Sequence, residues 1–234
     1  MKTKITFLFS LFTLCTSAQE VQLHYDFSKT RNYLTGTFEV FKPDSAGSTF
    51  FFTDFNFGRQ DGANLAYFEI ARKFNIKNEI INGLNLHIEY NDGFVMTDDK
   101  STSPSSPIGF PINRAYLAGF GFPIKIGNFT LHTSYLYKNI KGSSGIDGQF
   151  TAVFFQNLFK NKVTIRGFFD FWSQEIVLNS PDSNKKHMIL LTEPQIMYNF
   201  TTKFSVGSEI EISNNFVPNK AFKIYPTLFA KYTL

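Results

Sequence analysis

The stretch "STFFFTDFNFG", Ser48 to Gly58, holds five phenylalanines and one aspartate in eleven residues. A half-buried strand of a water-soluble protein alternates apolar and polar residues. Here the consecutive rings of Phe50, Phe51 and Phe52 occupy both faces of any strand they form. This pattern indicates a strand with lipid on one face and a partly polar interior on the other. We expect the outer face to carry Phe51, Thr53, Phe55 and Phe57, and the inner face to carry Phe50, Phe52, Asp54 and Asn56.

The same period-2 alternation recurs along the chain. In "NGLNLHIEYN", residues 82–91, apolar Leu84, Leu86 and Ile88 alternate with polar Asn85 and His87. No segment keeps a 3.6-residue apolar period, so almost no helix is expected. The segments read as strands, each ended by Gly, Pro, Asn, Asp or Ser, are 21–28, 31–42, 48–57, 64–74, 81–91, 113–122, 128–138, 148–157, 162–172, 187–200, 203–213 and 222–233.

The connections between these segments sort by length. Every second connection is short, at 43–47, 75–80, 123–127, 158–161 and 201–202, whereas most of the others are longer. Short periplasmic turns and long extracellular loops are typical of outer-membrane barrels. We therefore predict an all-β, antiparallel up-and-down transmembrane barrel of about twelve strands, in preference to a secreted β-sandwich or a lipocalin-like barrel. The longest connection, 92–112, is expected to be a solvated loop or a constriction in the pore.

The N-terminus indicates export. Lys2 and Lys4 precede an apolar run and a small-residue cleavage site at Ala18, so residues 1–18 are predicted to be a signal peptide and 19–234 the barrel domain. The single cysteine, Cys15, lies in that leader. Without the leader the net charge is near +2, with no basic run, so no nucleic-acid partner is expected. The predicted location is the outer membrane of a Gram-negative bacterium, with membrane lipid as a partner.

The inward positions offer rings and hydrogen-bonding groups together. Rings beside polar groups suit a flat solute with a polar edge. The inward acceptors are Glu39, Asp54, Glu69, Glu89, Asp170, Glu193, Glu209 and Glu211, against the cations Lys73, Arg166, Lys203 and Lys223. Because carboxylates are in excess, an anion-selective pore is not expected. The candidate solute contacts are Glu39, Phe50, Phe52, Asp54, Tyr67, Glu69, Arg166 and Asp170. The alternative is that these rings only pack the lumen and these charges only form a structural network.

One region also resembles a known family. The stretch "YLTGTFEVFKPDSAGSTFFFTDFNFG", 33–58, looks like the N-terminal region of the nucleoside-specific outer-membrane channels of the Tsx type. With "LHYDF", "FEVFKPD" and "AYFEIAR", it is more similar still to an uncharacterised family of related outer-membrane proteins. The resemblance implies a twelve-stranded barrel that conducts nucleosides. By this resemblance, only Glu39, Phe50, Phe52 and Asp54 are implied to be solute contacts in the lumen.

The sequence does not favour catalysis. His132 and Ser134 lie on one face of an expected strand, with Glu89 or Asp170 as a possible acid. Residues two apart on a strand are about 7 Å apart, which is too far for a direct Ser–His hydrogen bond. No metal-ligand spacing is found, so neither enzyme activity nor a cofactor is expected.

The sequence thus favours a passive channel for small solutes, with nucleosides as the leading class. The alternative is an accessory barrel of a larger outer-membrane complex without solute flux, in which another barrel or a machine is the partner.

Overall fold

The computed structural model describes residues 18–59, 62–77, 79–99, 106–175, 185–216 and 221–234, and all regular elements within these are strands. Within this described part, no helix is long and apolar enough to cross a membrane. The expected signal peptide lies outside the described residues except for Ala18, so it stays a prediction. The strands are β1 (Ala18–Asp26), β2 (Leu34–Asp44), β3 (Gly47–Phe57), β4 (Leu65–Asn75), β5 (Asn85–Asp99), β6 (Ser106–Ile126), β7 (Phe129–Ile140), β8 (Asp147–Leu158), β9 (Val163–Glu175), β10 (Lys186–Thr192), β11 (Gln195–Asn199), β12 (Phe204–Asn214) and β13 (Lys223–Thr233).

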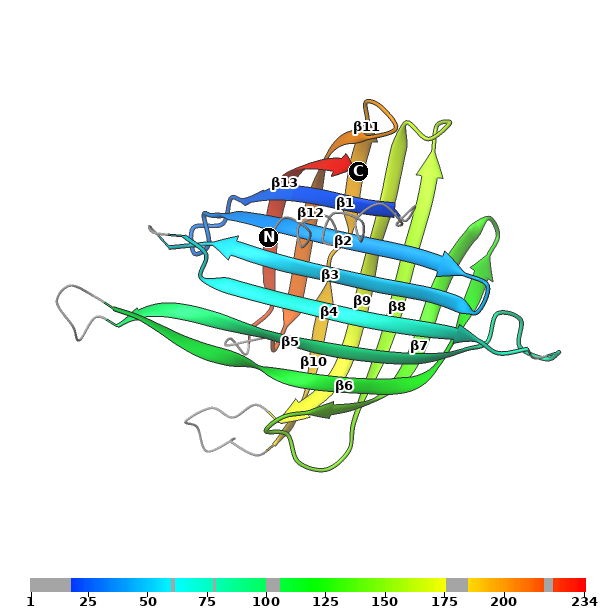
Figure 1. Ribbon diagram of the computed structural model, residues 1–234, viewed down its shortest axis with the longest axis horizontal. Helices are drawn as coiled ribbons and strands as arrows, with labels where there is room; N and C mark the ends of the chain where they lie inside the picture. Colours follow the sequence, from blue (N-terminus) through cyan, green and yellow to red (C-terminus); the bar gives the residue numbers. More distant parts are fainter. Residues whose placement is uncertain (1–17, 60–61, 78, 100–105, 176–184, 217–220) are drawn as a thin grey trace, which may run out of the picture.

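The strands form one closed antiparallel sheet (Figure 1). Neighbours in the chain pair with each other, and β1 pairs with β13 to close the ring. β10 and β11 are two parts of one strand, because Thr192 opposite Phe169 and Gln195 opposite Arg166 keep the same register on β9. The interruption falls at Pro194, which has no backbone N–H to donate. The wall of the barrel therefore consists of twelve strands, which confirms the predicted all-β barrel.

Both chain ends lie at the same end of the barrel, since Glu20 of β1 is opposite Thr233 of β13. The connections at this end are mostly tight turns, at 45–46, 127–128, 159–162 and 200–203. By the usual arrangement of such barrels this is the periplasmic end. One connection there, 76–84, is longer than expected because β5 begins at Asn85 rather than at residue 81.

The prediction of a long loop at 92–112 is wrong for most of that range, because β5 extends to Asp99 and β6 begins at Ser106. β5 and β6 continue as a paired hairpin, with Val95 opposite Phe110 and Thr97 opposite Ile108. Pro107 and Pro111 made this stretch look like a loop. β7 pairs with β6 only from Ala115 onward. Along residues 106–113 no described strand pairs with the other side of β6, and proline is tolerated at such an edge.

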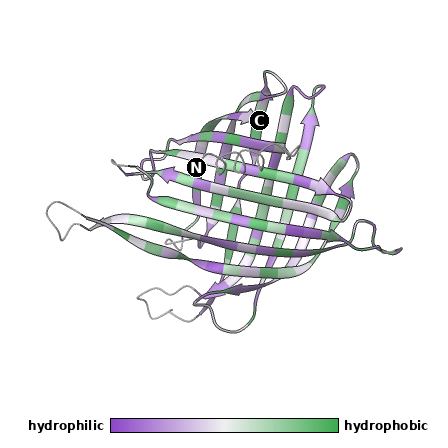
Figure 2. Cartoon of the chain, in the orientation of Figure 1, coloured by the Kyte–Doolittle hydropathy of each residue, from purple (hydrophilic) through white to green (hydrophobic). Residues whose placement is uncertain are grey.

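The barrel is polar inside and apolar outside. On β1, Gln22 is 2% exposed and His24 5%, whereas the intervening Leu23 is 49% exposed. Figure 2 shows this alternation along the strands. A surface on which apolar side chains face outward all around a closed sheet requires a lipid surrounding. The chain is therefore an outer-membrane type of barrel, and its location is the outer membrane of a Gram-negative bacterium.

A small apolar core lies inside the barrel against the β6 to β10 part of the wall. Leu117 is opposite Lys138 on the lumen side, and the Lys138 ammonium lies 4.3 Å from the centre of the Trp172 ring. Side chains therefore fill this part of the lumen. The buried members of this core are Ala115, Leu117, Leu136, Ile140, Trp172 and Ile189.

Candidate functional site in the lumen

Two rows of candidate residues follow from the register of β2, β3 and β4. Phe52 of β3 is opposite Glu39 on one side and Glu69 on the other, and they form the first row. Asp54 is opposite Thr37 and Tyr67, which form the second row. The structure thus places all of the candidates of these three strands on one wall of the lumen.

The rings of this wall pack against one another. The centre of the Phe52 ring lies 5.8 Å from that of Phe50 and 6.0 Å from that of Tyr67. The Tyr67 hydroxyl donates a 2.6 Å hydrogen bond to Glu69, and the Thr37 hydroxyl donates a 2.5 Å bond to Asp54. Aromatic surface and carboxylate oxygens therefore lie side by side, and we refer to Glu39, Phe50, Phe52, Asp54, Tyr67 and Glu69 as the aromatic-acid wall.

Arg166 of β9 reaches across the lumen to this wall. Its guanidinium bonds Glu20 of β1 and lies 3.3 Å from a carboxylate oxygen of Glu39 of β2. Three strands lie between β9 and β1 in the ring, so this is no contact between neighbours. Lys231 also contacts Glu20, at 3.0 Å, and Arg166 Nε donates a 2.7 Å bond to Gln195. These five residues form a cross-lumen cluster, in which the Arg166 side chain is only 14% exposed.

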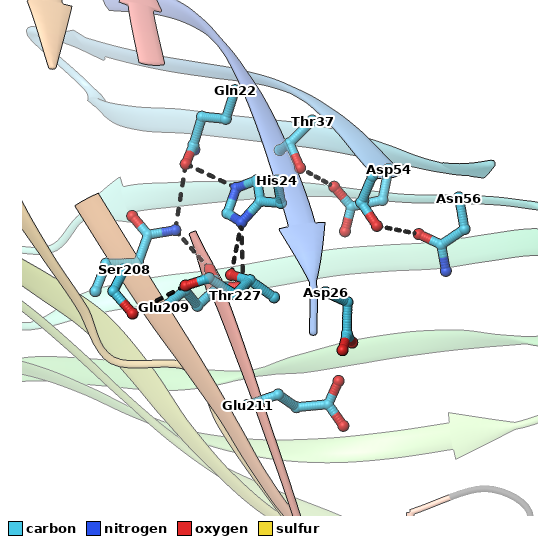
Figure 3. Close-up of polar contacts among 12 residues, drawn as sticks. Gln22, His24, Asp26, Thr37, Asp54, Asn56, Ser208, Glu209, Glu211 and Thr227 are labelled. Atoms are coloured by element: carbon cyan, nitrogen blue, oxygen red, sulfur yellow. Dashed lines mark hydrogen bonds and ion pairs between the residues drawn. The ribbon is translucent and has the colours of Figure 1, made fainter. Parts of the chain in front are cut away.

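The cross-lumen cluster continues into a buried network on β1, β12 and β13 (Figure 3). His24 Nδ1 lies 3.2 Å from the Thr227 hydroxyl, and its Nε2 lies 3.1 Å from Gln22 Oε1. Gln195 Nε2 donates a 2.6 Å bond to Glu209, which connects the two groups. His24, Gln22, Thr227 and Glu209 are therefore engaged with one another in the middle of the lumen.

Asp170, the remaining candidate, belongs to β9 and faces the aromatic-acid wall across the lumen, close enough for its carboxylate to interact electrostatically with Tyr67 and Glu69. It accepts a 2.6 Å hydrogen bond from Thr151 on β8. Thr151 also accepts a 2.9 Å bond from Gln149, which itself accepts a 2.6 Å bond from Lys138. Asp170 is therefore part of a chain of hydrogen bonds on β7, β8 and β9, and its interaction with Tyr67 and Glu69 is electrostatic.

A serine, a histidine and an acid do meet in the lumen, with His87 rather than His132 as the histidine. His87 Nδ1 lies 2.9 Å from Ser134 Oγ, and His87 Nε2 lies 3.1 Å from Glu89. The contact crosses β6, where Gly119 and Gly121 leave room because they have no side chain. These are the distances of a hydrolytic triad, but Ser134 is 0% exposed and no substrate reaches it. We assign the three residues to the interior packing of the lumen.

The extracellular rim holds a further ion pair. Arg31, in the connection between β1 and β2, donates two hydrogen bonds to Glu211, of 2.5 and 2.9 Å. Its guanidinium also lies 3.8 Å from the centre of the Tyr225 ring. Burial disfavours the charge of Arg31, but its hydrogen bonds to the Glu211 carboxylate and the attraction to that charge outweigh burial and raise the pKa of this group. The pair fixes the first extracellular connection over the mouth of the barrel.

Some lumen residues were not among the predicted site residues. Glu20 lay before the first expected strand, and Gln22 and His24 were not assigned to a face. The alternation of Val21, Leu23 and Tyr25 between them is the signal that identifies them. Lys203 was expected in the lumen, which is wrong, because it lies in the turn before β12 where its ammonium contacts Tyr232 on the outer face.

Metal chemistry finds no support in the part of the chain that the structure describes. There, no group of three His, Cys, Asp or Glu side chains is arranged to hold a metal ion.

Comparisons with known proteins give a family but no activity. The KdgM porin is 8% identical over 93% of this chain and 99% of its own, with a TM-score of 0.48. The translocator domain of the autotransporter NalP from Neisseria meningitidis is 8% identical over 93% and 87%, with a TM-score of 0.45. Omp33 of Acinetobacter baumannii is 10% identical over 93% and 99%, with a TM-score of 0.42. Similarities of this size do not extend to function.

No curated protein sequence matches the chain. A family model does match residues 18–234, which is the whole described barrel. This agrees with the expected uncharacterised family, whereas the relation to nucleoside channels stays a prediction. The chain belongs to the family described as a domain of unknown function, DUF5020.

Proposed function

We propose that this barrel is a passive outer-membrane channel for small polar solutes, with nucleosides as the leading class. The observation that carries the proposal is the aromatic-acid wall, in which the rings of Phe50, Phe52 and Tyr67 adjoin the carboxylates of Asp54 and Glu69. A flat solute can stack on the rings while its polar edge bonds the carboxylates. Stacking on one aromatic ring contributes about 1–3 kcal/mol per base.

The mechanism requires only diffusion. Binding in a channel must be weak enough to release the solute, and single-ring stacking meets this requirement. The cross-lumen cluster lies beside the wall, so Arg166 must move away from Glu20 or Glu39 for a solute to pass. No catalytic step, cofactor or energy source is part of the proposal.

Liposome swelling tests this function. Refolded protein in liposomes should admit nucleosides faster than sugars and amino acids of similar size, because only nucleosides stack. Phe52→Ala should lower the nucleoside rate severalfold and leave the sugar rate unchanged. Phe51→Ala is the matched control, since the neighbouring ring belongs to the outer face.

Each outcome has a distinct meaning. Equal entry of all solutes would leave a channel without nucleoside preference. No swelling from protein shown to be folded by its heat-modifiable gel mobility would overturn the channel.

A second function is favoured by the β5–β6 hairpin. β6 leaves β7 beyond Ala115, whereas β5 stays paired with β4 as far as Val95. Phe94 therefore lies at the base of the hairpin and Phe110 on its projecting part. About half of the surface of each ring is exposed. Exposed rings on a projecting hairpin suit a partner protein. In this alternative the barrel is an accessory subunit. It predicts no swelling, together with co-purification of a large partner that is lost in a Phe94→Ser, Phe110→Ser variant.

A further inference from the structure

A small pocket opens on the outer surface at the extracellular end of β5, β6 and β7. It has a volume of about 100 Å³ and is lined by Asp92, Pro111, Ile112, Arg114 and Lys141. The pocket exists because β6 contains one extra residue where the register passes from Asn91 opposite Ala115 to Gly93 opposite Ile112. Such a bulge bends a strand and redirects its side chains.

The pocket lies at the level where the wall leaves the lipid. Tyr116 is two residues from Arg114 on the same face of β6, and half of its surface is exposed to the outside. The centre of the Tyr116 ring lies 4.9 Å from that of Tyr90. Exposed tyrosines on the outer face are found at the boundary between acyl chains and headgroups. The two cations, Arg114 and Lys141, lie one step beyond this boundary, on the side away from both chain ends.

The charge of the pocket is positive. The backbone N–H of Lys141 donates a 3.0 Å bond to the carbonyl of Arg114, which holds the two cations side by side. The only carboxylate in the lining, Asp92, accepts a 2.5 Å bond from the Tyr90 hydroxyl and a 2.7 Å bond from the N–H of Gly93. Among residues whose side chains the structure describes, no carboxylate forms an ion pair with Arg114 or Lys141 within 4 Å. One positive charge is therefore left over.

We propose that this pocket binds a phosphate group of an anionic, acylated lipid of the outer leaflet. A guanidinium and an ammonium side by side supply the charge-assisted donors that phosphate oxygens accept. The apolar lining of Pro111 and Ile112 and the two tyrosines suit the first carbons of acyl chains, which free phosphate does not have. The site is independent of the channel function, since it faces away from the lumen.

Lipid binding to the refolded barrel in zwitterionic micelles tests the proposal. Diphosphorylated lipid A is titrated against wild type and against Arg114→Gln, Lys141→Gln, and the dissociation constant is measured. The double variant should bind at least ten times more weakly. Lys125→Gln, Lys160→Asn removes the same charge at the periplasmic end, where both side chains are exposed, and should change the affinity less than twofold.

Two further measurements distinguish the site from a structural role. Arg114→Lys, Lys141→Arg keeps both charges and should bind within about threefold of wild type, and all variants must show the heat-modifiable mobility of a folded barrel. Lipid A without phosphate groups should bind wild type as weakly as the double variant does. Equal binding of dephosphorylated lipid A, equal loss in the periplasmic variant, or displacement of lipid A by an equimolar amount of inorganic phosphate would each overturn the proposal.

Discussion

At the scale of single residues, Arg166 decides how open the lumen is. It connects β9 with Glu20 and Glu39 on the opposite side of the ring, and its position on the lumen face follows from the alternation of "KVTIRGFFDFW". What it contacts does not follow from that alternation. Contacts across the lumen depend on the diameter and stagger of the closed barrel, which no local pattern in the chain specifies.

Arg166→Gln should loosen the barrel and widen the path through it. Removing one partner of a buried ion pair costs about 3–5 kcal/mol, because the other partner is left without a counter-charge. Lys231 still neutralises Glu20 in this variant, so Glu39 is the group that loses its cation. We expect the folded gel band to be lost at a lower heating temperature than in wild type. We also expect a higher single-channel conductance in planar bilayers.

The double variant Glu39→Gln, Arg166→Gln is the control for this pair. It should recover part of the lost thermal stability and keep the raised conductance. If the single variant matches wild type in both measurements, the cross-lumen cluster neither stabilises nor narrows the barrel.

At the scale of elements, β6 shows how glycines shape the interior. A Cβ added at Gly119 would lie 2.0 Å from the backbone carbonyl oxygen of Tyr135, and one added at Gly121 would lie 2.6 Å from that of Thr133. β6 and β7 pair so closely here that only glycine fits, and the space above them admits the contact between His87 and Ser134. In the part of β6 that extends beyond β7, there is room for a side chain at Gly109, since nothing lies within 4 Å of a Cβ placed there.

Gly119→Ala should therefore impair folding, whereas Gly109→Ala should not. The first substitution forces the backbones of β6 and β7 apart, and the second places a methyl group in open space. Refolding into micelles, followed by gel mobility without heating, measures the folded fraction. A folded fraction of Gly119→Ala equal to that of Gly109→Ala would contradict the close approach.

The strands were predictable to the extent that their pattern is local. The two faces of β3 are as expected, because period-2 alternation assigns Phe52 and Asp54 to the same side wherever the strand lies. The extension of β5 and β6 was not predictable, since Pro107 and Pro111 are read as loop residues unless one knows that no described strand pairs with this edge of β6. Asp170 is on the expected face, but its separation from Asp54 depends on the position of β9 in the ring.

At the scale of the whole molecule, the lumen is acidic. More carboxylates than cations face the lumen, and this excess of negative charge suits neutral or cationic solutes. Among the described residues, the lumen-facing carboxylates include those of Glu20, Asp26, Glu39, Asp54, Glu69, Glu89, Asp170, Glu193, Glu209 and Glu211, whereas the cations include Lys73, Lys138, Arg166, Lys223 and Lys231.

An open channel of this composition should pass potassium more readily than chloride. The reversal potential across a planar bilayer with a KCl gradient measures this preference. Asp54→Asn, Glu69→Gln should shift the potential toward zero, because it removes two lumen carboxylates. Glu79→Gln, in the exposed periplasmic connection, should leave the potential unchanged. Preference for chloride in wild type would contradict the assignment of these carboxylates to the conducting path.

The pairing of β1 with β13 also governs how the molecule is made. The two strands come from opposite ends of the chain, and their register runs over seven residue pairs from Glu20 to Asp26. Until the last strand has been synthesised, β1 and β12 both keep an unpaired edge, which a bilayer core does not tolerate. Insertion must therefore wait for release of the finished polypeptide, and a chain cut short before residue 223 should remain a client of periplasmic chaperones and proteases rather than become a smaller barrel.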